Sequence, residues 1–323
     1  MADDLSRRAF LYRSALISAG ALSLFASKFG NAAEARDSTK SRTRLILLGT
    51  SAGSPPNPIR AAAANVVIID GISYVIDCGD GVARQIAKAG ISFRQMPYIF
   101  ITHHHSDHTA DYGNLLQLGA AAGRTGRVDV FGPPPLKKMT EQFFDMIRPE
   151  MENRIKDGTR PYEHDVYVHE ITGGGLVHQD ERVKVSAALV YHPPVVPSFA
   201  YRFDSADRSI TFSGDTNYSE NLIKLAQDTD VLVHEVLHMG IVEEYVRKNP
   251  RGRNVEVFLK HLRETHTSPE DAGKVAALSN AKMLVFSHIG PQISPPIPDQ
   301  VFVDAARKTF GGKIVIGQDL MEI

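Results

Sequence analysis

The sequence predicts an α/β fold in which two β-sheets face each other and helices cover their outer faces. Short apolar segments rich in β-branched residues recur from residue 44 to residue 317. Helix-like segments separate several of them, and polar turns join others. Segments that alternate in this way bury their apolar faces between packed layers. No internal repeat and no long linker interrupts residues 43–323, so a single domain is expected there.

The first half of this domain begins with strands and then alternates strands with helices. A helix-like stretch follows the polar turn at residues 77–81 and ends at Gly90, a residue typical of helix ends. A short β-branched strand then leads directly into a run of histidines. Strands are expected at residues 44–48, 64–69, 73–76, 98–102 and 128–131, and helices at residues 82–89, 115–122 and 136–156.

The second half reads mainly as strands joined by polar turns. Apolar, β-branched runs of this length are typical of strands buried in a sheet. They are expected at residues 165–171, 182–191, 199–203, 209–213, 231–235, 283–287 and 313–317.

Composition excludes several classes of protein. The chain has 323 residues, of which 43% are hydrophobic, enough for a substantial core. A formal net charge of −1 and the absence of tryptophan argue against a nucleic-acid partner, which would favour a basic, base-stacking surface. Cys78 is the single cysteine, so an intramolecular disulfide and a cysteine-rich zinc module are excluded.

The N-terminus resembles a twin-arginine bacterial export signal. Arg7 and Arg8 precede an apolar stretch at residues 15–26, which is shorter than the roughly 20 residues needed to span a bilayer. Small residues at 32–35 then provide a cleavage zone. The resemblance implies removal of residues 1–35, a periplasmic location and no stable membrane anchor. An ordinary amphipathic first helix with a chance arginine pair is the alternative.

A metal site is predicted at the end of the strand at residues 98–102. His103 and His105 are two residues apart, so in an extended segment both side chains point to one side and can bind one ion. Asp107 and His108 follow a turn and can reach a second ion. Imidazole and carboxylate are the ligands that zinc prefers where thiolate is not available.

This run of ligands resembles the signature of the metallo-β-lactamase superfamily, whose fold is an αββα sandwich of two mixed β-sheets flanked by helices. The resemblance implies that His192 completes a first site with His103 and His105. It also implies that His288 completes a second site with Asp107 and His108, and that Asp215 bridges the two ions. Each of these later residues follows an apolar segment: His192, Asp215 and His288. Two divalent ions, with Zn²⁺ expected, would be the cofactors.

Further motifs resemble the branch that contains ribonuclease Z (the transfer-RNA 3′-processing endonuclease), arylsulfatases and small phosphodiesterases. They lie at residues 48–50, 77–79 and 197–202, at His234-Glu235, and at His266-Thr267-Ser268. The resemblance implies that His266 donates a proton to the leaving group, and that His234 and Glu235 orient the metal ligands. The alternative for His266 is a structural position ahead of a helix capped by Ser268.

The sequence departs from that branch in two places. Only 23 positions separate His192 from Asp215, which leaves room for two strands and a turn but not for the arm that grips transfer RNA. Residues 238–263 are longer than in small relatives and contain six basic side chains. This insert could be a lid, a homodimer contact, a clamp for an anionic substrate or a solvated surface hairpin.

The expected function is that of an exported dinuclear metal hydrolase acting on a small anionic ester, as arylsulfatases and phosphodiesterases do. A hydroxide shared by the two ions would attack, Asp107 would orient it, and His266 would protonate the leaving group. A lactonase or carboxylic esterase is the alternative within hydrolysis. A mono-iron enzyme that oxidises persulfides is disfavoured, because Asp107, His108 and His288 complete a second site. A non-enzymatic metal-binding scaffold is also disfavoured.

Overall fold

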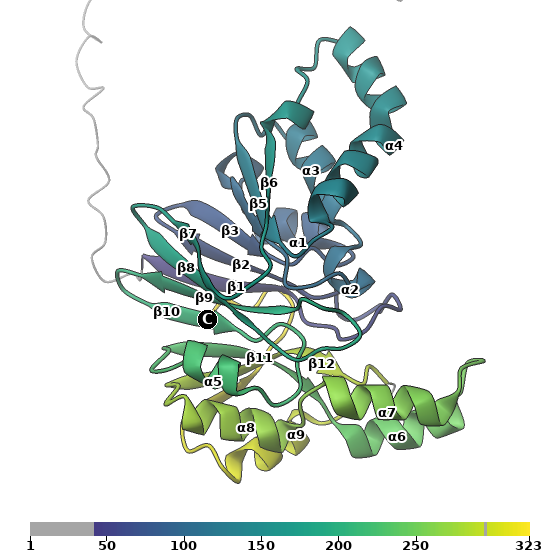
Figure 1. Ribbon diagram of the computed structural model, residues 1–323, viewed down its shortest axis with the longest axis vertical. Coiled ribbons are helices and arrows are strands. Elements are labelled where there is room, and N and C mark those ends of the chain that lie inside the picture. The colour runs from purple at the N-terminus through teal and green to yellow at the C-terminus, as the bar shows by residue number, and fades with distance from the viewer. Residues whose placement is uncertain (1–41, 294–295) are drawn as a thin grey trace, which may run out of the picture. The chain divides into compact units, whose positions relative to one another are not determined.

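The computed structural model describes residues 42–293 and 296–323, so the predicted export signal lies outside the described residues. Two β-sheets pack face to face, with helices on their outer sides (Figure 1). All strands of the first sheet precede all strands of the second, so the chain passes from one sheet to the other between β6 and β7. The two-sheet architecture expected from the sequence is thus confirmed.

The first sheet has six strands in sequence order. Its first three strands are antiparallel, and β3 to β6 run parallel to one another. Its strands are β1 (Thr43–Gly49), β2 (Ala64–Ile69), β3 (Ile72–Ile76), β4 (Tyr98–Phe100), β5 (Val128–Gly132) and β6 (Val166–Glu170). Its outer face carries α1 (Val82–Lys88), α3 (Tyr112–Ala121) and α4 (Leu136–Lys156).

The second sheet has seven strands, in the order β13-β12-β11-β10-β9-β8-β7. The strands from β7 to β10 are antiparallel, and those from β10 to β13 are parallel. They are β7 (Gly175–Gln179), β8 (Val183–Leu189), β9 (Phe199–Ser205), β10 (Ser209–Phe212), β11 (Val231–Leu237), β12 (Met283–Gly290) and β13 (Lys313–Ile316). Its outer face carries α5 (Glu220–Leu225), α8 (Pro269–Leu278) and α9 (Asp299–Arg307).

Side-chain alternation along the strands divides the core into layers. In β1, Leu45 and Leu47 point between the two sheets, whereas Ile46 and Leu48 point under the helices of the first sheet. Successive side chains of a strand point to opposite faces, and here both faces are covered. Central strands such as β2 are therefore buried at every position, which explains why they appear in the sequence as continuous apolar runs.

Several elements were not expected from the sequence. They include β7, whose residues are partly or fully exposed, and the helices α5, α6 (Met239–Lys248), α7 (Val255–Thr265) and α9. The helix considered after Ser268 is present as α8, and the Ser268 side chain caps it. The strand predicted at residues 182–191 ends at Leu189 as β8, and the helix predicted at 115–122 begins earlier, at Tyr112. Element ends carry a weak periodic signal, because few residues contribute to it.

The basic insert folds as two helices, α6 (Met239–Lys248) and α7 (Val255–Thr265), which we call the α6–α7 hairpin. It projects beside the end of the second sheet (Figure 1). Its helices pack around a small apolar cluster that contains Leu259, whose side chain is fully buried, and Leu237 at the end of β11. The side chains of His238 and Asn254 cap the two helix N-termini. Within the described residues, no helix has the length and apolar character needed to cross a bilayer.

Candidate metal centre

The predicted ligands His103 to His108 lie on the segment that leaves β4. His105 is extended and immediately precedes the one-turn helix α2 (Ser106–Thr109), which contains Asp107 and His108. The change from extended chain to helix directs the side chains on either side of Ser106 toward two different groups of ligands. The strand-end position lets these side chains converge without disturbing the packed core.

The first group of ligands contains three imidazoles and one carboxylate. His105 Nδ1 lies 3.1 Å from His103 Nε2 and 3.0 Å from His192 Nε2. Asp215 Oδ2 lies 3.7 Å from His103 Nε2 and 3.9 Å from His192 Nε2. The four candidate ligand atoms lie within 4.8 Å of one another, so the structure brings together the four residues predicted for the first ion.

The second group shares Asp215 with the first. His108 Nε2 lies 3.2 Å from Asp215 Oδ1, and His288 Nε2 lies 3.3 Å from Asp215 Oδ2. Asp107 Oδ2 is 3.2 Å from His288 Nε2 and 3.8 Å from His108 Nε2. Asp215 therefore faces both groups, which is the position predicted for a bridging carboxylate.

The donor atoms fit a cation. His108 Nε2 and Asp215 Oδ1 are both buried, and neither has a hydrogen-bond partner among the described residues. Burial lowers the pKa of His103 well below its ordinary value and lowers the pKa of His192 to about 4, so both rings are neutral. Neutral imidazoles whose nitrogens converge on a buried carboxylate are suited to binding a divalent metal ion.

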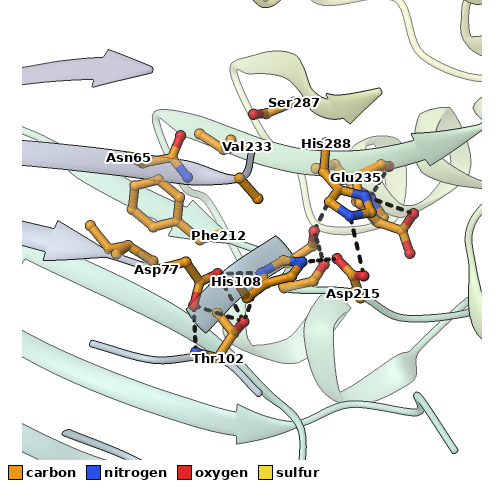
Figure 2. Close-up of a pocket in the computed structure, with 15 residues that line it drawn as sticks. Asn65, Asp77, Thr102, His108, Phe212, Asp215, Val233, Glu235, Ser287 and His288 are labelled. Atoms are coloured by element: carbon orange, nitrogen blue, oxygen red, sulfur yellow. Dashed lines mark hydrogen bonds and ion pairs between the residues drawn. The ribbon is translucent and has the colours of Figure 1, made fainter. Parts of the chain in front are cut away.

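Residues behind the ligands hold them in place, and the sequence analysis did not assign them this role. His108 lies between Asp77 and Thr102 on one side and Asp215 on the other (Figure 2). Asp77 Oδ2 accepts a hydrogen bond from His108 Nδ1 at 2.8 Å, and its other oxygen accepts one from the Thr102 backbone N–H. This bond fixes the ring so that Nε2 faces the centre. The position of Asp77, a carboxylate directly after the apolar strand β3, could have indicated this role from the sequence.

Two further ligands are oriented by backbone groups. His192 Nδ1 lies 2.9 Å from the carbonyl oxygen of Thr265, at the end of α7. The backbone N–H of Gly53 donates to Asp107 Oδ2 at 2.9 Å. Every residue has a backbone carbonyl, and all but proline have an N–H, so these two partners could not be predicted from the sequence.

The predicted proton donor, His266, is paired with Glu235. Its Nδ1 lies 3.0 Å from both carboxylate oxygens of Glu235, which is buried on β11. Burial lowers the pKa of His266, but the Glu235 carboxylate and its hydrogen bond outweigh burial and raise that pKa to about 9. The Nε2 edge of the ring, which has no hydrogen-bond partner among the described residues, is available to a bound ester in the cleft that His266 lines.

His234 does not contact the ligands by hydrogen bonds. Its Nδ1 lies 2.7 Å from the backbone carbonyl of Glu235, and its buried Nε2 has no hydrogen-bond partner among the described residues. Glu235 instead reaches toward the centre, since Oε2 lies 3.9 Å from His288 Nδ1. Of the two residues predicted to orient ligands, the structure places only Glu235 beside one.

Backbone conformation at the ligands is tightly constrained. His288 has φ 48° and Gly214, the residue before Asp215, has φ 58°, both in the left-handed region. A Cβ at Gly214 would lie 2.5 Å from the carbonyl oxygen of Phe199, so any side chain there would displace the strand that supports Asp215. Left-handed backbone at a non-glycine residue costs free energy and is often found at functional sites.

The centre opens into a cleft of about 580 Å³. His105, Asp107, Asp215 and His288 lie at its base with His266. One wall is the α6–α7 hairpin, and the other is the proline-rich segment at residues 55–58. This volume lies within the range of small-molecule sites in proteins.

Two separate likenesses identify the class of protein that this fold and centre define. Residues 73–289 match the model of the β-lactamase superfamily domain, and the chain belongs to this superfamily of hydrolases. Ribonuclease Z of Mycobacterium bovis (strain BCG / Pasteur 1173P2) is 31% identical over 286 residues, which cover 86% of this chain and 97% of that protein. Ribonuclease Z of Mycobacterium sp. (strain KMS) is 32% identical over 285 residues, covering 86% and 95%.

Solved structures show the same fold. The metallo-β-lactamase fold protein YhfI from Bacillus subtilis has a TM-score of 0.65 and 15% identity, over 87% of this chain and 98% of that one. The human short form of tRNase Z (ELAC1) has a TM-score of 0.62 and 23% identity, over 87% and 98%. The fold expected from the resemblance of the histidine run is thus confirmed, and the grouped ligands support the use of a divalent metal.

Proposed function

We propose that the protein hydrolyses the phosphodiester bond of a small anionic ester at a centre of two divalent metal ions, with zinc as the expected metal. The observation that carries this proposal is the position of Asp215. Its two oxygens lie within 3.2–3.9 Å of ligand nitrogens from both groups. One carboxylate that serves both groups is suited to bridging a pair of ions.

The side chains around the centre divide the work of hydrolysis. Divalent ions at such a site lower the pKa of water and withdraw charge from ester oxygens. Asp107 is fixed by the Gly53 N–H. It would hold the ion at the second position and would accept a hydrogen bond that orients the attacking water. His266, kept protonated by Glu235, donates its Nε2 proton to the oxygen that leaves.

A phosphodiester substrate is preferred to other esters because relatives of this chain are named as ribonucleases. A ribonuclease cleaves phosphodiester bonds, and proteins named ribonuclease Z match nearly their whole length to this chain. A small substrate is preferred to RNA because the segment between His192 and Asp215 contains only β9, β10 and turns. No arm long enough to grip RNA extends from that described segment.

A panel of substrates with one leaving group tests this function. We expect turnover of bis(p-nitrophenyl) phosphate by the zinc-loaded protein to exceed turnover of p-nitrophenyl sulfate and p-nitrophenyl acetate. The shared leaving group ensures that differences report on the group under attack. Faster sulfate cleavage would favour an arylsulfatase, and faster acetate or lactone cleavage would favour the carboxylic-ester alternative.

Two further measurements address the remaining alternatives. Metal analysis should give two equivalents of metal in the active protein. A single equivalent of iron with persulfide oxidation and no esterase turnover would replace the proposal with the redox alternative. Release of the 3′ trailer from precursor transfer RNA, at a rate above that of the small diester, would make RNA the substrate.

We also propose that the protein acts in the periplasm after twin-arginine export. Arg7 and Arg8 ahead of the short apolar stretch support this proposal. In a bacterial host, a reporter fused after residues 1–41 should reach the periplasm in its folded state. Arg7→Lys combined with Arg8→Lys should retain the reporter in the cytoplasm, and export unaffected by both changes would contradict the proposal.

A further inference from the structure

The α6–α7 hairpin is connected at its base to the catalytic groups. The chain leaves the second sheet after β11 and returns at His266, where the 3.0 Å contact between His266 and Glu235 closes the loop. The backbone N–H of Leu237 also donates to the carbonyl of Thr267 at 2.9 Å. The hairpin thus leaves and re-enters the fold at the metal centre, so it is well placed to contact the part of a substrate that extends away from the metal ions.

Most basic side chains of the hairpin are neutralised by acidic neighbours. Each of four forms an ion pair on the hairpin itself, with Glu243, Glu244, Glu256 or Glu264 as partner: Arg247, Lys248, Lys260 and Arg263. The other two, Arg251 and Arg253, form no ion pair with any residue that the structure describes. Both also line the cleft above the metal centre.

Aromatic side chains hold these two guanidinium groups in place. Arg251 Nη2 donates to the hydroxyl of Tyr245 at 2.8 Å, and the guanidinium carbon of Arg253 lies 4.3 Å from the ring centre of Phe258. Tyr245 and Phe258 line the same cleft. Stacking leaves most guanidinium N–H groups free, in the planar arrangement that matches a carboxylate or phosphate.

The backbone conformation at Arg251 favours a role for its side chain outside the turn. This residue has φ 49°, in the left-handed region, and lies beside Gly252 in the turn between the helices. A non-glycine residue in that region is strained, and glycine or asparagine would adopt it more easily. An arginine at this place is therefore poorly explained by the needs of the turn.

Apolar side chains line the cleft between the arginines and the metal centre. On the hairpin, Val242, Val246 and Leu262 line the cleft, and the opposite wall is lined by prolines of the segment at residues 55–58. Residues 249–254 join the ends of α6 and α7 that lie farthest along the hairpin from His266. A ligand that lies along the hairpin would thus meet metal ligands at one end, apolar walls in the middle and the guanidinium groups of this turn at the other end.

From this arrangement we infer that Arg251 and Arg253 bind a second anionic group of the substrate, separated by an apolar part from the ester that is cleaved. The substrate class is then an elongated diester with a carboxylate or phosphate at its far end. The inference rests on the proposed function, because the metal end of the cleft is taken to hold the scissile phosphodiester. The turn between α6 and α7 would then determine which substrate binds, although it takes no part in the hydrolysis step.

The test uses p-nitrophenyl phosphodiesters whose second arm is an alkyl chain of increasing length ending in hydroxyl, carboxylate or phosphate. At the length that spans the cleft, we expect kcat/KM for an anionic end group to exceed that for hydroxyl by about 10- to 100-fold, as charge-assisted hydrogen bonds provide. Comparison of carboxylate with phosphate identifies the preferred end group. Non-hydrolysable phosphonates of the same lengths give the corresponding affinities by calorimetry.

The variants separate binding from folding. In the R251N and R253Q double variant the ratio of anionic to hydroxyl substrate should fall to about one, and asparagine suits the left-handed backbone at residue 251. K248Q removes the same type of charge from the outside of the hairpin and should keep the wild-type ratio. A ratio of one in the wild type at every length, or a ratio unchanged in the double variant, would overturn the inference.

Failure of the proposed function would look different. In that case no phosphodiester of the series would be cleaved, including those with a hydroxyl end. The phosphonate affinities would still decide whether the two arginines select an anionic end group.

Discussion

At the scale of single residues, the centre depends on side chains that each serve more than one partner. Asp215 faces both groups of ligands, and Glu235 holds His266 while it lies near His288. Removing such a residue leaves several buried polar atoms without partners at once. Buried polar groups without partners are costly, so substitutions here should have effects on several measurable properties together.

Asp215→Ala should remove metal and activity together. Loss of the shared carboxylate leaves Asp107 as the acidic neighbour of His108 Nε2 and His288 Nε2, and leaves the first group of ligands without a carboxylate. Because changes even to residues behind metal ligands cost about 10- to 100-fold in metal affinity or activity, we expect more than a 100-fold loss of kcat/KM here. Mass-spectrometric metal analysis and diester turnover measure the two effects. Asp145→Ala, which removes an exposed carboxylate on α4, is the control, and unchanged two-metal occupancy would refute the bridging role.

His266→Gln should slow cleavage of alkyl esters more than cleavage of p-nitrophenyl esters. An alkoxide needs a proton to leave, and p-nitrophenoxide hardly does, so the loss should approach about 100- to 10,000-fold only for the alkyl series. The protonated donor exists below its pKa of about 9, so activity on alkyl esters should fall as the pH rises through that value. Glu235→Gln removes the charge that raises this pKa and should move the fall to lower pH. Equal losses for both leaving groups would exclude the proton-donor role.

At the scale of elements, the α6–α7 hairpin is a small folding unit attached to the main core. Its buried side chains form a fourth cluster, which joins the hairpin to Leu237 at the end of β11. α7 ends at Thr265, whose carbonyl orients His192, and is followed directly by His266. The packing of this hairpin should therefore influence both metal binding and proton donation.

Leu259→Ala should loosen the hairpin without unfolding the sandwich. Removing a fully buried leucine side chain costs about 2–5 kcal/mol, and here the cavity would form inside a four-residue core. We expect faster hydrogen exchange at residues 239–265 and lower turnover, measured by mass spectrometry and assay. Val257→Ala, on an exposed face of the same helix, should change neither. Faster exchange across both sheets would show that the hairpin is not an independent unit.

At the scale of the whole molecule, the metal ligands come from both sheets. The segment after β4 supplies four of them, and the second sheet supplies His192, Asp215 and His288. Bound ions would thus add contacts between two halves that already meet through an apolar layer and through hydrogen bonds such as that from Tyr201 to the Ile101 carbonyl. Ligands that bind only the folded state stabilise it by mass action.

Removal of metal should lower the melting temperature. An ion present at about 1,000 times its dissociation constant stabilises the fold by about 4 kcal/mol. For a domain of this size that corresponds to a shift of about 10 °C, measurable by calorimetry after dialysis against a chelator. Added zinc should restore the original value in the wild type and have little effect on Asp215→Ala. An unchanged melting temperature after complete metal removal would contradict this expectation.

Much of the fold and the centre could be predicted because the ligands follow continuous apolar strands. The run from His103 to His108 could be recognised as ligands because it directly follows a strand, whereas His192, Asp215 and His288 could be grouped with it only through the resemblance to the metallo-β-lactamase superfamily. The α6–α7 hairpin was harder, since Pro250 and Gly252 interrupt its pattern and its apolar residues pack mainly on one another. The Thr265 carbonyl could not be found at all, because a backbone group has no identity in the sequence.

The passage of the chain between β6 and β7 has a consequence for how the protein could be divided into two fragments. A break in the loop between Glu170 and Gly175 would give two polypeptides, each with a complete set of strands for one sheet. Neither would hold every ligand of either ion, although the second would still carry the C-terminal residue whose N–H pairs with Leu45 of β1. Zinc uptake by the mixture would then report that the halves had reassembled. This division makes the protein a natural starting point for a split enzyme whose signal depends on two fused partners meeting.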